Sequence, residues 1–329
     1  MKKQTVAILG AGSWGTAVAL HLAQIGHQVL LWSHDPQQVA QMSKEGVNSA
    51  YLPDSPFPSN IKPHADLQYC LQEADDVIIA IPSHGFADLI RRINPKPKGL
   101  TWLTKGVDPK SNCLLSDIVA QTFGNDFPVA ILSGPSFAKE VARFLPTAVT
   151  LAANNISYQK HIQALFHYEN LRVYLCDDLI GVQLCGAVKN ILAIACGISD
   201  GMGFGANSKA ALITRGLAEM RRLGISLGAK QETFLGLAGV GDLVLTCTDD
   251  QSRNRRFGQL LGRGTPIDEA EKQIGQVVEG KYNAAQVCTL ARNKGIEMPI
   301  CEQINALLTG KIKANEAVVN LMSRPAKEE

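Results

Sequence analysis

Lys189 is the residue whose surroundings most clearly favour chemistry. It is the only charged residue in the apolar stretch 184–196, which reads Leu-Cys-Gly-Ala-Val-Lys-Asn-Ile-Leu-Ala-Ile-Ala-Cys. A lysine is almost never fully buried without a partner, so this side chain either extends to solvent or takes part in catalysis. Burial lowers the pKa of a lysine towards the range in which it exchanges protons, whereas an adjacent carboxylate would oppose that effect. We therefore interpret Lys189 as a proton donor and acceptor.

Two polar segments that could bind an anion lie further along the chain. Asp242 is the one acid in the stretch 236–243, and Ser252, Arg253 and Asn254 begin ten residues after it. Taken singly, an acid after glycines is often a helix cap, and an arginine run is usually a solvated surface. Together with a buried lysine they predict a phosphate site, because arginine binds phosphate through two hydrogen bonds while Asn and Ser bind hydroxyl groups.

Two loops that follow expected strands carry further polar residues. Lys105 comes after the strand 100–103, so its ammonium group is expected at the carboxyl end of that strand. Gly134 and Ser136 come after the strand 129–132 and before a helical run, where free N–H groups and a hydroxyl form a binding corner for a hydroxyl or phosphate group. The alternative readings are a solvated loop lysine and plain helix capping.

A glycine turn at the start of the chain predicts a dinucleotide site. The strand 6–9 leads into Gly10-Ala-Gly12-Ser-Trp-Gly15, and a helical run follows. In this context the first glycine permits the tight turn, the second lets the backbone approach a pyrophosphate, and the third lets helix and strand pack closely. The helix N-terminus stabilises the phosphate charge.

The end of the next strand bears on the choice of cofactor. An acid at this place would bind the ribose 2′-hydroxyl of NAD, but the strand 29–32 ends in Ser33-His34-Asp35. Ser33 and His34 suit a 2′-phosphate, whereas Asp35 would oppose one. The sequence therefore favours NADP(H) slightly and leaves NAD open; an exposed turn residue is the other reading of His34.

Strands and helices alternate in the first half of the chain, which predicts an α/β fold with an N-terminal Rossmann-type, doubly wound parallel sheet. The expected strands are β-branched and apolar runs: Thr5–Leu9, Val29–Trp32, Val77–Ile81, Leu100–Leu103, Val129–Leu132, Ala148–Leu151 and Leu171–Leu175. The expected helices between them include Thr16–Ile25, His84–Ile93 and Leu114–Thr122. The proline-rich segment Leu52–Pro63 is expected to be a long loop without an assigned role.

Helical spacing replaces the strand signals after about residue 180. The expected helices are Val182–Ile198, Ser208–Leu223, Arg255–Leu261, Asn283–Lys294 and Pro299–Thr309. We expect a dinucleotide-binding domain at residues 1–180 and an all-helical substrate-binding and catalytic domain at residues 181–329. Because ligands of open α/β sheets bind outside the carboxyl ends of the strands, the cleft between the halves is the expected active site.

Composition excludes several other classes of protein. The chain has 329 residues, about two domains, with 46% hydrophobic and 19% charged residues, which is typical of a globular protein. A net charge of +2 and an aromatic content of 6% argue against nucleic-acid binding. The 8 cysteines form no C-x-x-C or Cys/His cluster, so no metal site is expected. No signal peptide or membrane span is expected either, and the predicted location is the cytoplasm.

These motifs together resemble the bacterial-type NAD(P)-dependent glycerol-3-phosphate dehydrogenases. The resemblance runs end to end, and its most specific parts are the lysine helix and the later Gly-Asp and Ser-Arg-Asn segments. The motifs are Gly10-x-Gly-Ser-Trp-Gly-Thr-Ala, Thr104-Lys-Gly, Ser133-Gly-Pro-Ser-Phe-Ala-x-Glu140, Gly186-Ala-Val-Lys-Asn190, Ala211-Leu-Ile-Thr-Arg-Gly-Leu-Ala-Glu-Met220, Gly239-x-Gly-Asp-Leu243 and Ser252-Arg-Asn254.

The resemblance implies the interconversion of sn-glycerol 3-phosphate and dihydroxyacetone phosphate with NAD(P), supplying phospholipid synthesis, and a homodimer. It implies that Lys189 is the catalytic acid and base, that Asp242 orients the lysines, and that Lys105 binds substrate and its charge. Further substrate contacts are implied for Gly134, Ser136, Ser252, Arg253 and Asn254. Cofactor contacts are implied for Ser13, Trp14, His34, Lys105, Ala138, Arg253, Val277 and Glu279.

Two other classes of function remain as alternatives. A 2-hydroxyacid or UDP-sugar dehydrogenase shares the type of fold, but it would not need a Ser-Arg-Asn phosphate site, and the latter enzyme would normally expose a catalytic cysteine. A nucleotide-sensing binding protein would leave Lys189 and the two polar segments without a purpose.

Overall fold

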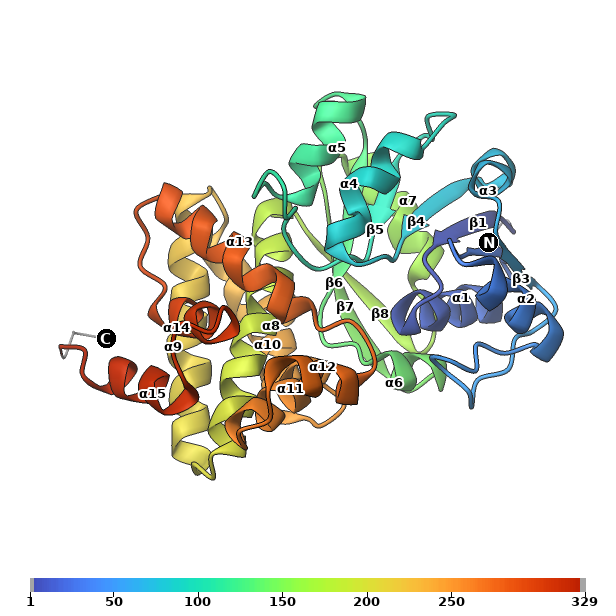
Figure 1. Ribbon diagram of the computed structural model, residues 1–329. Helices are drawn as coiled ribbons and strands as arrows, with labels where there is room; N and C mark the ends of the chain where they lie inside the picture. Colours follow the sequence, from blue (N-terminus) through green and yellow to red (C-terminus); the bar gives the residue numbers. More distant parts are fainter. Residues whose placement is uncertain (1–2, 326–329) are drawn as a thin grey trace. The chain divides into compact units, whose positions relative to one another are not determined.

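The computed structural model describes residues 3–325, which form two compact units. One unit contains the chain up to Lys105 together with Leu115–Val182, and the other contains Gly106–Leu114 and the chain from Gln183. The first unit is a sheet covered by helices, and the second is built from helices (Figure 1). The predicted fold class is confirmed in this respect.

The sheet of the first unit has eight strands in the order β3-β2-β1-β4-β5-β6-β7-β8. Their bounds are β1 (Thr5–Leu9), β2 (Gln28–Trp32), β3 (Ile61–His64), β4 (Asp76–Ile79), β5 (Leu100–Trp102), β6 (Val129–Ser133), β7 (Thr147–Ala153) and β8 (Leu171–Cys176). The strands from β3 to β6 are parallel neighbours. Their carboxyl ends therefore share one edge, which carries the glycine turn.

The structure corrects two details of the expected sheet. The pair β6–β7 is antiparallel, so β7 and β8 run against the other strands. Apolar strands look alike in either direction, and the short helix in the connection, α6 (Ala138–Ala142), packs on α1 (Ser13–Ile25) instead of crossing the sheet. The end of the expected proline-rich loop also forms β3. Pro63 is tolerated there because β3 pairs only with β2 and is an edge strand.

Helices cover both faces of this sheet. Besides α1 and α6 they are α2 (Pro36–Glu45), α3 (Leu67–Glu73), α4 (Ser83–Arg92), α5 (Leu115–Phe123) and α7 (Ile156–Phe166). Successive side chains of β5 show the two faces, because neighbouring residues of a strand point in opposite directions. Trp102 makes an edge contact with Phe86 of α4, whereas the Thr101 hydroxyl lies 3.0 Å from the Tyr158 hydroxyl of α7.

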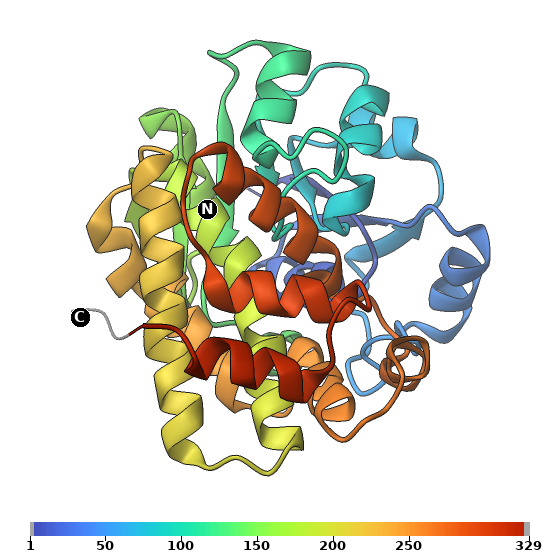
Figure 2. The same ribbon diagram turned by 60° about the vertical axis from the view of Figure 1, so that its left-hand side comes forward.

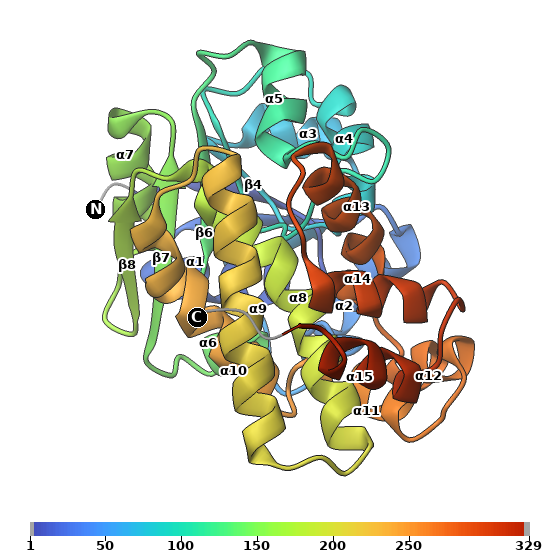
Figure 3. The ribbon, with the colours of Figure 1, turned by 90° about the vertical axis from the view of Figure 1, so that its left-hand side faces the viewer.

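Helix α7 lies beside the edge strand β8 (Figure 3), and side chains of α7 and of its C-cap residue His167 cover the backbone of that strand. The Val173 N–H donates to Nδ1 of His167 (3.2 Å), and Gln163 donates to the Val173 carbonyl (2.9 Å). Gln159 donates to the Cys176 carbonyl (2.6 Å). Polar backbone groups on an open edge invite pairing with another chain, so these contacts protect the edge.

The second unit is organised around two long helices that pack along each other, α8 (Leu179–Gly201) and α9 (Ala206–Ser226), drawn yellow-green and yellow in Figure 2. The remaining helices are α10 (Asp242–Thr248), α11 (Arg253–Gly262), α12 (Ile267–Ile274), α13 (Glu279–Asn293), α14 (Pro299–Leu308) and α15 (Ala314–Met322). By length and mean hydropathy, 1.8, α8 could cross a membrane, but 89% of that stretch is buried in the protein, as in a core helix.

Glycines bring the backbones of α8 and α11 into direct contact. A Cβ atom at Gly197 would lie 2.1 Å from the Arg255 carbonyl oxygen, and one at Gly258 would lie 2.2 Å from that of Ile194. Gly201 and Gly262 repeat these approaches one turn further along. Only residues without a side chain permit such a crossing. It fixes α11 against the C-terminal part of α8, from Ile194 to Gly201.

We expect Gly258→Ala to lower the free energy of unfolding by about 1–3 kcal/mol, as overpacking does. The sign is informative, because glycine to alanine within a helix usually stabilises by roughly 0.5–1 kcal/mol. The matched control is Gly85→Ala in α4, where the nearest atom to an added Cβ, Ile81 Cδ1, is 3.4 Å away. Urea denaturation of both variants checks this; equal effects would contradict the close crossing.

Glu219 of α9 caps the N-terminus of α14. Its carboxylate accepts hydrogen bonds from the backbone N–H of Ile300 (2.7 Å) and of Cys301 (3.3 Å). Burial raises the pKa of Glu219 to about 7, although these two N–H groups and Arg222 partly offset the effect. The native protein therefore holds a proton here that the unfolded chain releases at lower pH.

This shift predicts a pH dependence of stability. Between the ordinary pKa of 4.5 and about 7 the native state binds more protons at Glu219, so the free energy of unfolding should fall as pH rises through this window. The full contribution is roughly 3 kcal/mol, at 1.36 kcal/mol per pKa unit. In urea titrations at pH 5 and 7.5, we expect the wild type to lose most of this contribution on going to the higher pH and Glu219→Gln to lose none of it. Parallel pH profiles would contradict it.

Candidate active site

The three glycines of the turn after β1 have three different environments. Gly10 has φ of 131°, and a Cβ there would lie 2.5 Å from the Ala80 carbonyl oxygen. A Cβ at Gly15 would lie 1.9 Å from the Gly10 carbonyl oxygen. A Cβ at Gly12 would meet no atom of the described residues within 4 Å, so the space beside this glycine is open. This is the arrangement in which a pyrophosphate approaches the backbone at the middle glycine.

The N-terminus of α1 also suits an anion. Gly12 is its N-cap, no side chain caps the helix, and no acid lies in its first turn. Ser13 and Trp14 begin the helix; the Trp14 indole nitrogen is buried and has no hydrogen-bond partner among residues 3–325. The orphan N–H groups of a helix N-terminus and its partial positive charge favour a phosphate at this place. The residues present therefore fit a dinucleotide.

The end of β2 differs from what the sequence suggests. Ser33 is only 3% exposed, and its hydroxyl donates to Oε1 of Gln38 (2.6 Å) while accepting from the Asp35 N–H (3.2 Å). Asp35 caps α2 by accepting from the Gln37 N–H (2.9 Å). His34 is exposed. Of the residues after this strand, His34 is thus the one available to a ligand, and the Ser33 hydroxyl is occupied.

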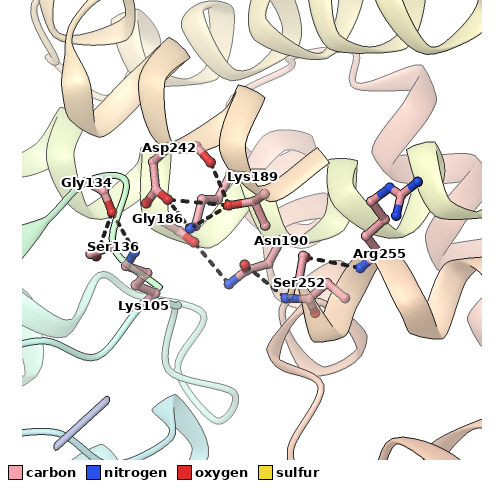
Figure 4. A network of polar contacts seen from close by, with 11 residues as sticks. Lys105, Gly134, Ser136, Gly186, Lys189, Asn190, Asp242, Ser252 and Arg255 are labelled. Atoms are coloured by element: carbon pink, nitrogen blue, oxygen red, sulfur yellow. Dashed lines mark hydrogen bonds and ion pairs between the residues drawn. The ribbon is translucent and has the colours of Figure 1, made fainter. Parts of the chain in front are cut away.

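The loops after β5 and β6 meet at one carbonyl group. The Lys105 ammonium lies 3.4 Å from the Gly134 carbonyl oxygen, to which the Ser136 hydroxyl also donates (2.9 Å; Figure 4). Gly134 has φ of 136°, which favours glycine. Ala138 is the first residue of α6, directly beyond this loop. The predicted residues Lys105, Gly134 and Ser136 therefore lie together within the first unit.

Lys189 lies in α8 and forms a buried ion pair. Its ammonium group donates to Oδ1 of Asp242 and to the Thr246 hydroxyl (2.9 Å), both on α10 (Figure 4). Lys189 is 6% exposed and Asp242 is 1% exposed. The Thr246 hydroxyl in turn donates to the Asp242 carbonyl oxygen (2.6 Å). Burial alone favours a neutral lysine, but this carboxylate favours the ammonium form. The side chain is therefore a cation that is held in one place and shielded from water.

A chain of amides extends from the residue next to Lys189. Asn190 donates to the Gly186 carbonyl oxygen (3.3 Å) and accepts from Asn254 of α11 (3.0 Å). Asn254 in turn accepts from the Gly280 N–H of α13 (2.9 Å). Sequence reasoning assigned no role to Asn190 or Thr246. The available signals were the position of Asn190 beside the lysine and the i+4 spacing of Thr246 from Asp242, which places both on one helix face.

The arginines of α11 have separate roles. Arg255 is buried in ion pairs with Asp200, at 2.6 Å, and with Asp250, so it stabilises the helix packing. Arg256 is exposed. Arg253 is half-buried and donates to Oε1 of Gln276 (3.2 Å), in the segment that leads through Val277 to Glu279, the first residue of α13.

Ser252 is the N-cap of α11, because its hydroxyl accepts from the Arg255 N–H (3.2 Å). This capping role was not expected from the sequence, and the bond leaves the hydroxyl proton of Ser252 unused. Ser252, Arg253 and Asn254 thus form the first turn of one helix. Among residues 3–325, no group of three or more His, Cys, Asp and Glu side chains is placed to hold a metal ion.

The doubly wound sheet, with this glycine turn in its first strand–helix unit, defines a dinucleotide-binding protein of the dehydrogenase class. Residues 5–159 match the N-terminal model, and residues 178–319 the C-terminal model, of NAD-dependent glycerol-3-phosphate dehydrogenase. The chain belongs to this family.

Relatives along the whole chain agree. It is 72% identical to a glycerol-3-phosphate dehydrogenase [NAD(P)+] of Legionella pneumophila strain Corby, with 100% of both chains covered. It is 51% identical to the enzyme of the same name from Thioalkalivibrio sulfidiphilus, again over 100% of both. The crystal structure of glycerol-3-phosphate dehydrogenase from Coxiella burnetii is similar with a TM-score of 0.95 and 51% identity, covering 98% of this chain and 99% of that one.

Proposed function

We propose that this protein is an NAD(P)-dependent glycerol-3-phosphate dehydrogenase, which interconverts sn-glycerol 3-phosphate and dihydroxyacetone phosphate. The observation that carries the proposal is the buried pair of Lys189 and Asp242 in a chain of this family, because such a fixed cation suits a carbonyl oxygen that gains negative charge. The product would supply phospholipid synthesis in the cytoplasm.

The first unit supplies most of the proposed cofactor contacts. The pyrophosphate would bind at the glycine turn and the N-terminus of α1, where the space beside Gly12 is open. Further contacts are proposed for His34, Lys105 and Ala138, and in the second unit for Arg253, Val277 and Glu279. The bound dinucleotide supplies the hydride that reaches C2 of the ketone. NADP(H) is slightly favoured over NAD(H), because no free acid ends β2.

Lys189 would donate a proton to the C2 oxygen during reduction and accept it during oxidation. Asp242 holds the ammonium group in place, and Thr246 provides a second fixed acceptor at 2.9 Å. Because both partners are buried, the cation faces little competition from water and stabilises negative charge more strongly than it would in solution.

The substrate phosphate would bind at the first turn of α11. Arg253 supplies a planar cation with two donors, and Ser252 and Asn254 supply neighbouring polar groups. Lys105, Gly134 and Ser136 would contact the same substrate from the first unit. On this basis we assign residues 1–180 to cofactor binding and residues 181–329 to substrate binding and catalysis. A homodimer is proposed from the family alone.

The alternatives predict different behaviour. A UDP-sugar dehydrogenase needs a reactive cysteine, but six of the eight cysteines are buried, and burial raises the pKa of Cys70 and of Cys288 to about 12. Oxidation of NADPH and NADH, followed at 340 nm with and without dihydroxyacetone phosphate, tests the proposal. We expect oxidation only when the ketone is present. Turnover with a 2-oxo acid instead, or cofactor binding without any turnover, would overturn the assignment.

A further inference from the structure

Two amide side chains hold the carbonyl group in the centre of the glycine turn. Nε2 of Gln38, in α2, donates to the Ala11 carbonyl oxygen at 2.8 Å, and Nδ2 of Asn48, beyond that helix, donates to the same oxygen at 2.9 Å. Both groups come from outside the turn, 27 and 37 residues along the chain. The turn is therefore fixed by tertiary contacts as well as by its glycines.

This carbonyl determines where the next N–H points. The peptide between Ala11 and Gly12 is planar and trans, so its N–H is directed opposite to its carbonyl oxygen. With the oxygen held by Gln38 and Asn48, the Gly12 N–H faces away from these side chains. The position beside Gly12 is also the open one in the turn. Rotation of this peptide would cost both hydrogen bonds, so the N–H direction is set before any ligand arrives.

Gln38 also connects the turn with the end of β2. Its Oε1 accepts from the Ser33 hydroxyl at 2.6 Å while its Nε2 donates to Ala11. Ser33 is buried, so this contact excludes its hydroxyl from a ligand on the surface. The residue that sequence reasoning placed near a 2′-phosphate thus contributes to the geometry of the glycine turn instead.

The proline-rich segment, which had no assigned role, holds Asn48. The Asn48 carbonyl accepts from the N–H of Leu52 (2.8 Å), the first residue of that segment, and from the N–H of Tyr51 (3.1 Å), directly before it. Asn48 is 1% exposed; its Nδ2 also donates to the Thr16 hydroxyl, whereas its Oδ1 has no partner among the described residues. A buried acceptor without a partner costs stability, so the two contacts of Nδ2, with the turn and with α1, are what an asparagine contributes here.

We propose that Gln38 and Asn48 are positioning residues for the dinucleotide: they hold the Ala11 carbonyl so that the Gly12 N–H is directed at the bound pyrophosphate. This inference rests on the proposed function. The inference also gives Ser33 a new role: by binding Gln38 it supports the turn, and so it contributes to the affinity for NADH and for NADPH alike. The contact involves the pyrophosphate, which both cofactors have, and not the 2′-phosphate. Loss of the contact should therefore weaken the binding of both cofactors equally.

The test measures the dissociation constants of NADPH and NADH by titration calorimetry without substrate. We expect Gln38→Ala and Asn48→Ala each to weaken both cofactors by about three- to tenfold, as for one lost hydrogen bond. The double variant should lose more than the product of the two, since either amide alone still holds the carbonyl. The matched control is Gln41→Ala on the same helix, whose exposed side chain donates hydrogen bonds to Glu45 and Ser49 and not to the glycine turn.

A positioning role has a kinetic signature that misfolding lacks. In Gln38→Ala, kcat at saturating cofactor and the KM for dihydroxyacetone phosphate should stay within about twofold of wild type, because a defect in ground-state binding alone raises the cofactor KM. Gln38 keeps the test valid if Asn48→Ala fails to fold, since Gln38 is less buried.

Three results would overturn the inference, and they differ in what else they affect. If Gln38→Ala binds both cofactors as tightly as Gln41→Ala does, the positioning role is wrong and the proposed function is unaffected. If the affinity falls for NADPH alone, Ser33 and Gln38 act on the 2′-phosphate and not on the pyrophosphate. Failure of the unsubstituted protein to bind either cofactor would overturn both the inference and the proposed function.

Discussion

Replacing Lys189 by alanine is expected to lower kcat by at least about 100-fold, the low end of what general acid–base catalysis contributes. The variant lacks a buried cation and, with it, the proposed proton donor to the C2 oxygen. NADPH affinity should be nearly unchanged, because the glycine turn lies on other elements. Steady-state kinetics with dihydroxyacetone phosphate measure the effect. A variant within threefold of the wild-type kcat would contradict the role of Lys189.

Two controls separate chemistry from folding in this experiment. Removing Lys189 leaves Asp242, which is 1% exposed, without its counter-charge, and breaking a buried pair in this way costs about 3–5 kcal/mol of stability. The variant Lys189→Ala/Asp242→Asn removes that unpaired charge, so it should recover stability but not activity. Lys281→Ala is the matched lysine, since its pair with Glu271 at 2.6 Å is partly exposed; it should keep full activity.

Chemical rescue gives a further readout. Truncation to alanine leaves space for a small amine at the position of the lost ammonium group. We expect methylamine to raise the rate of Lys189→Ala in proportion to its concentration and to leave Lys281→Ala unaffected. Rescue would show that the amine acts in the reaction, which a structural lysine would not explain.

The local motifs could be predicted from sequence because their reasons are local. The glycine turn needs three residues without side chains within six positions, and the structure shows a close approach at Gly10 and Gly15 and open space at Gly12. Seven of the eight strands were predicted as apolar runs, and β3 was missed because prolines dominate its segment. The direction of β7 was wrong, because side-chain pattern does not distinguish parallel from antiparallel pairing.

The partners within the site could not be predicted, because they come from distant parts of the chain. Lys189 and Asp242 are 53 residues apart, and Asn48 is 37 residues from Ala11. The residue pattern indicated only that a buried lysine needs a partner; Asp242 was named by the resemblance to a family, and the structure shows the direct ion pair. Sequence reasoning assigned no role to the glycines of α8 and α11, because that role depends on the crossing of two helices, which a single segment does not reveal.

The environment of Arg253 also depends on residues that are distant in the chain, and it leads to a second prediction with a large expected effect. Three arginines stand close together in the sequence, and the resemblance implied a ligand contact for Arg253 alone. The structure adds that Arg255 is buried in ion pairs and that Arg256 is exposed. Arg253 is half-buried at the first turn of α11, between the cap residue Ser252 and Asn254. A phosphate needs a cation with fixed paired donors, which arginine has and lysine lacks.

We expect Arg253→Ala to lower kcat/KM for dihydroxyacetone phosphate. The loss of transition-state stabilisation should be roughly 2–5 kcal/mol, the usual range for breaking a buried charge pair. Arg253→Lys should recover only part of this, and Arg256→Ala, the exposed neighbour, should have little effect. Dihydroxyacetone lacks the phosphate, so its slow turnover should hardly change in Arg253→Ala. Because remote binding energy helps to align the ketone, the loss should appear in kcat as well as in KM. Equal losses on both substrates would assign Arg253 to the cofactor or, through its 3.2 Å contact with Gln276, to the fold.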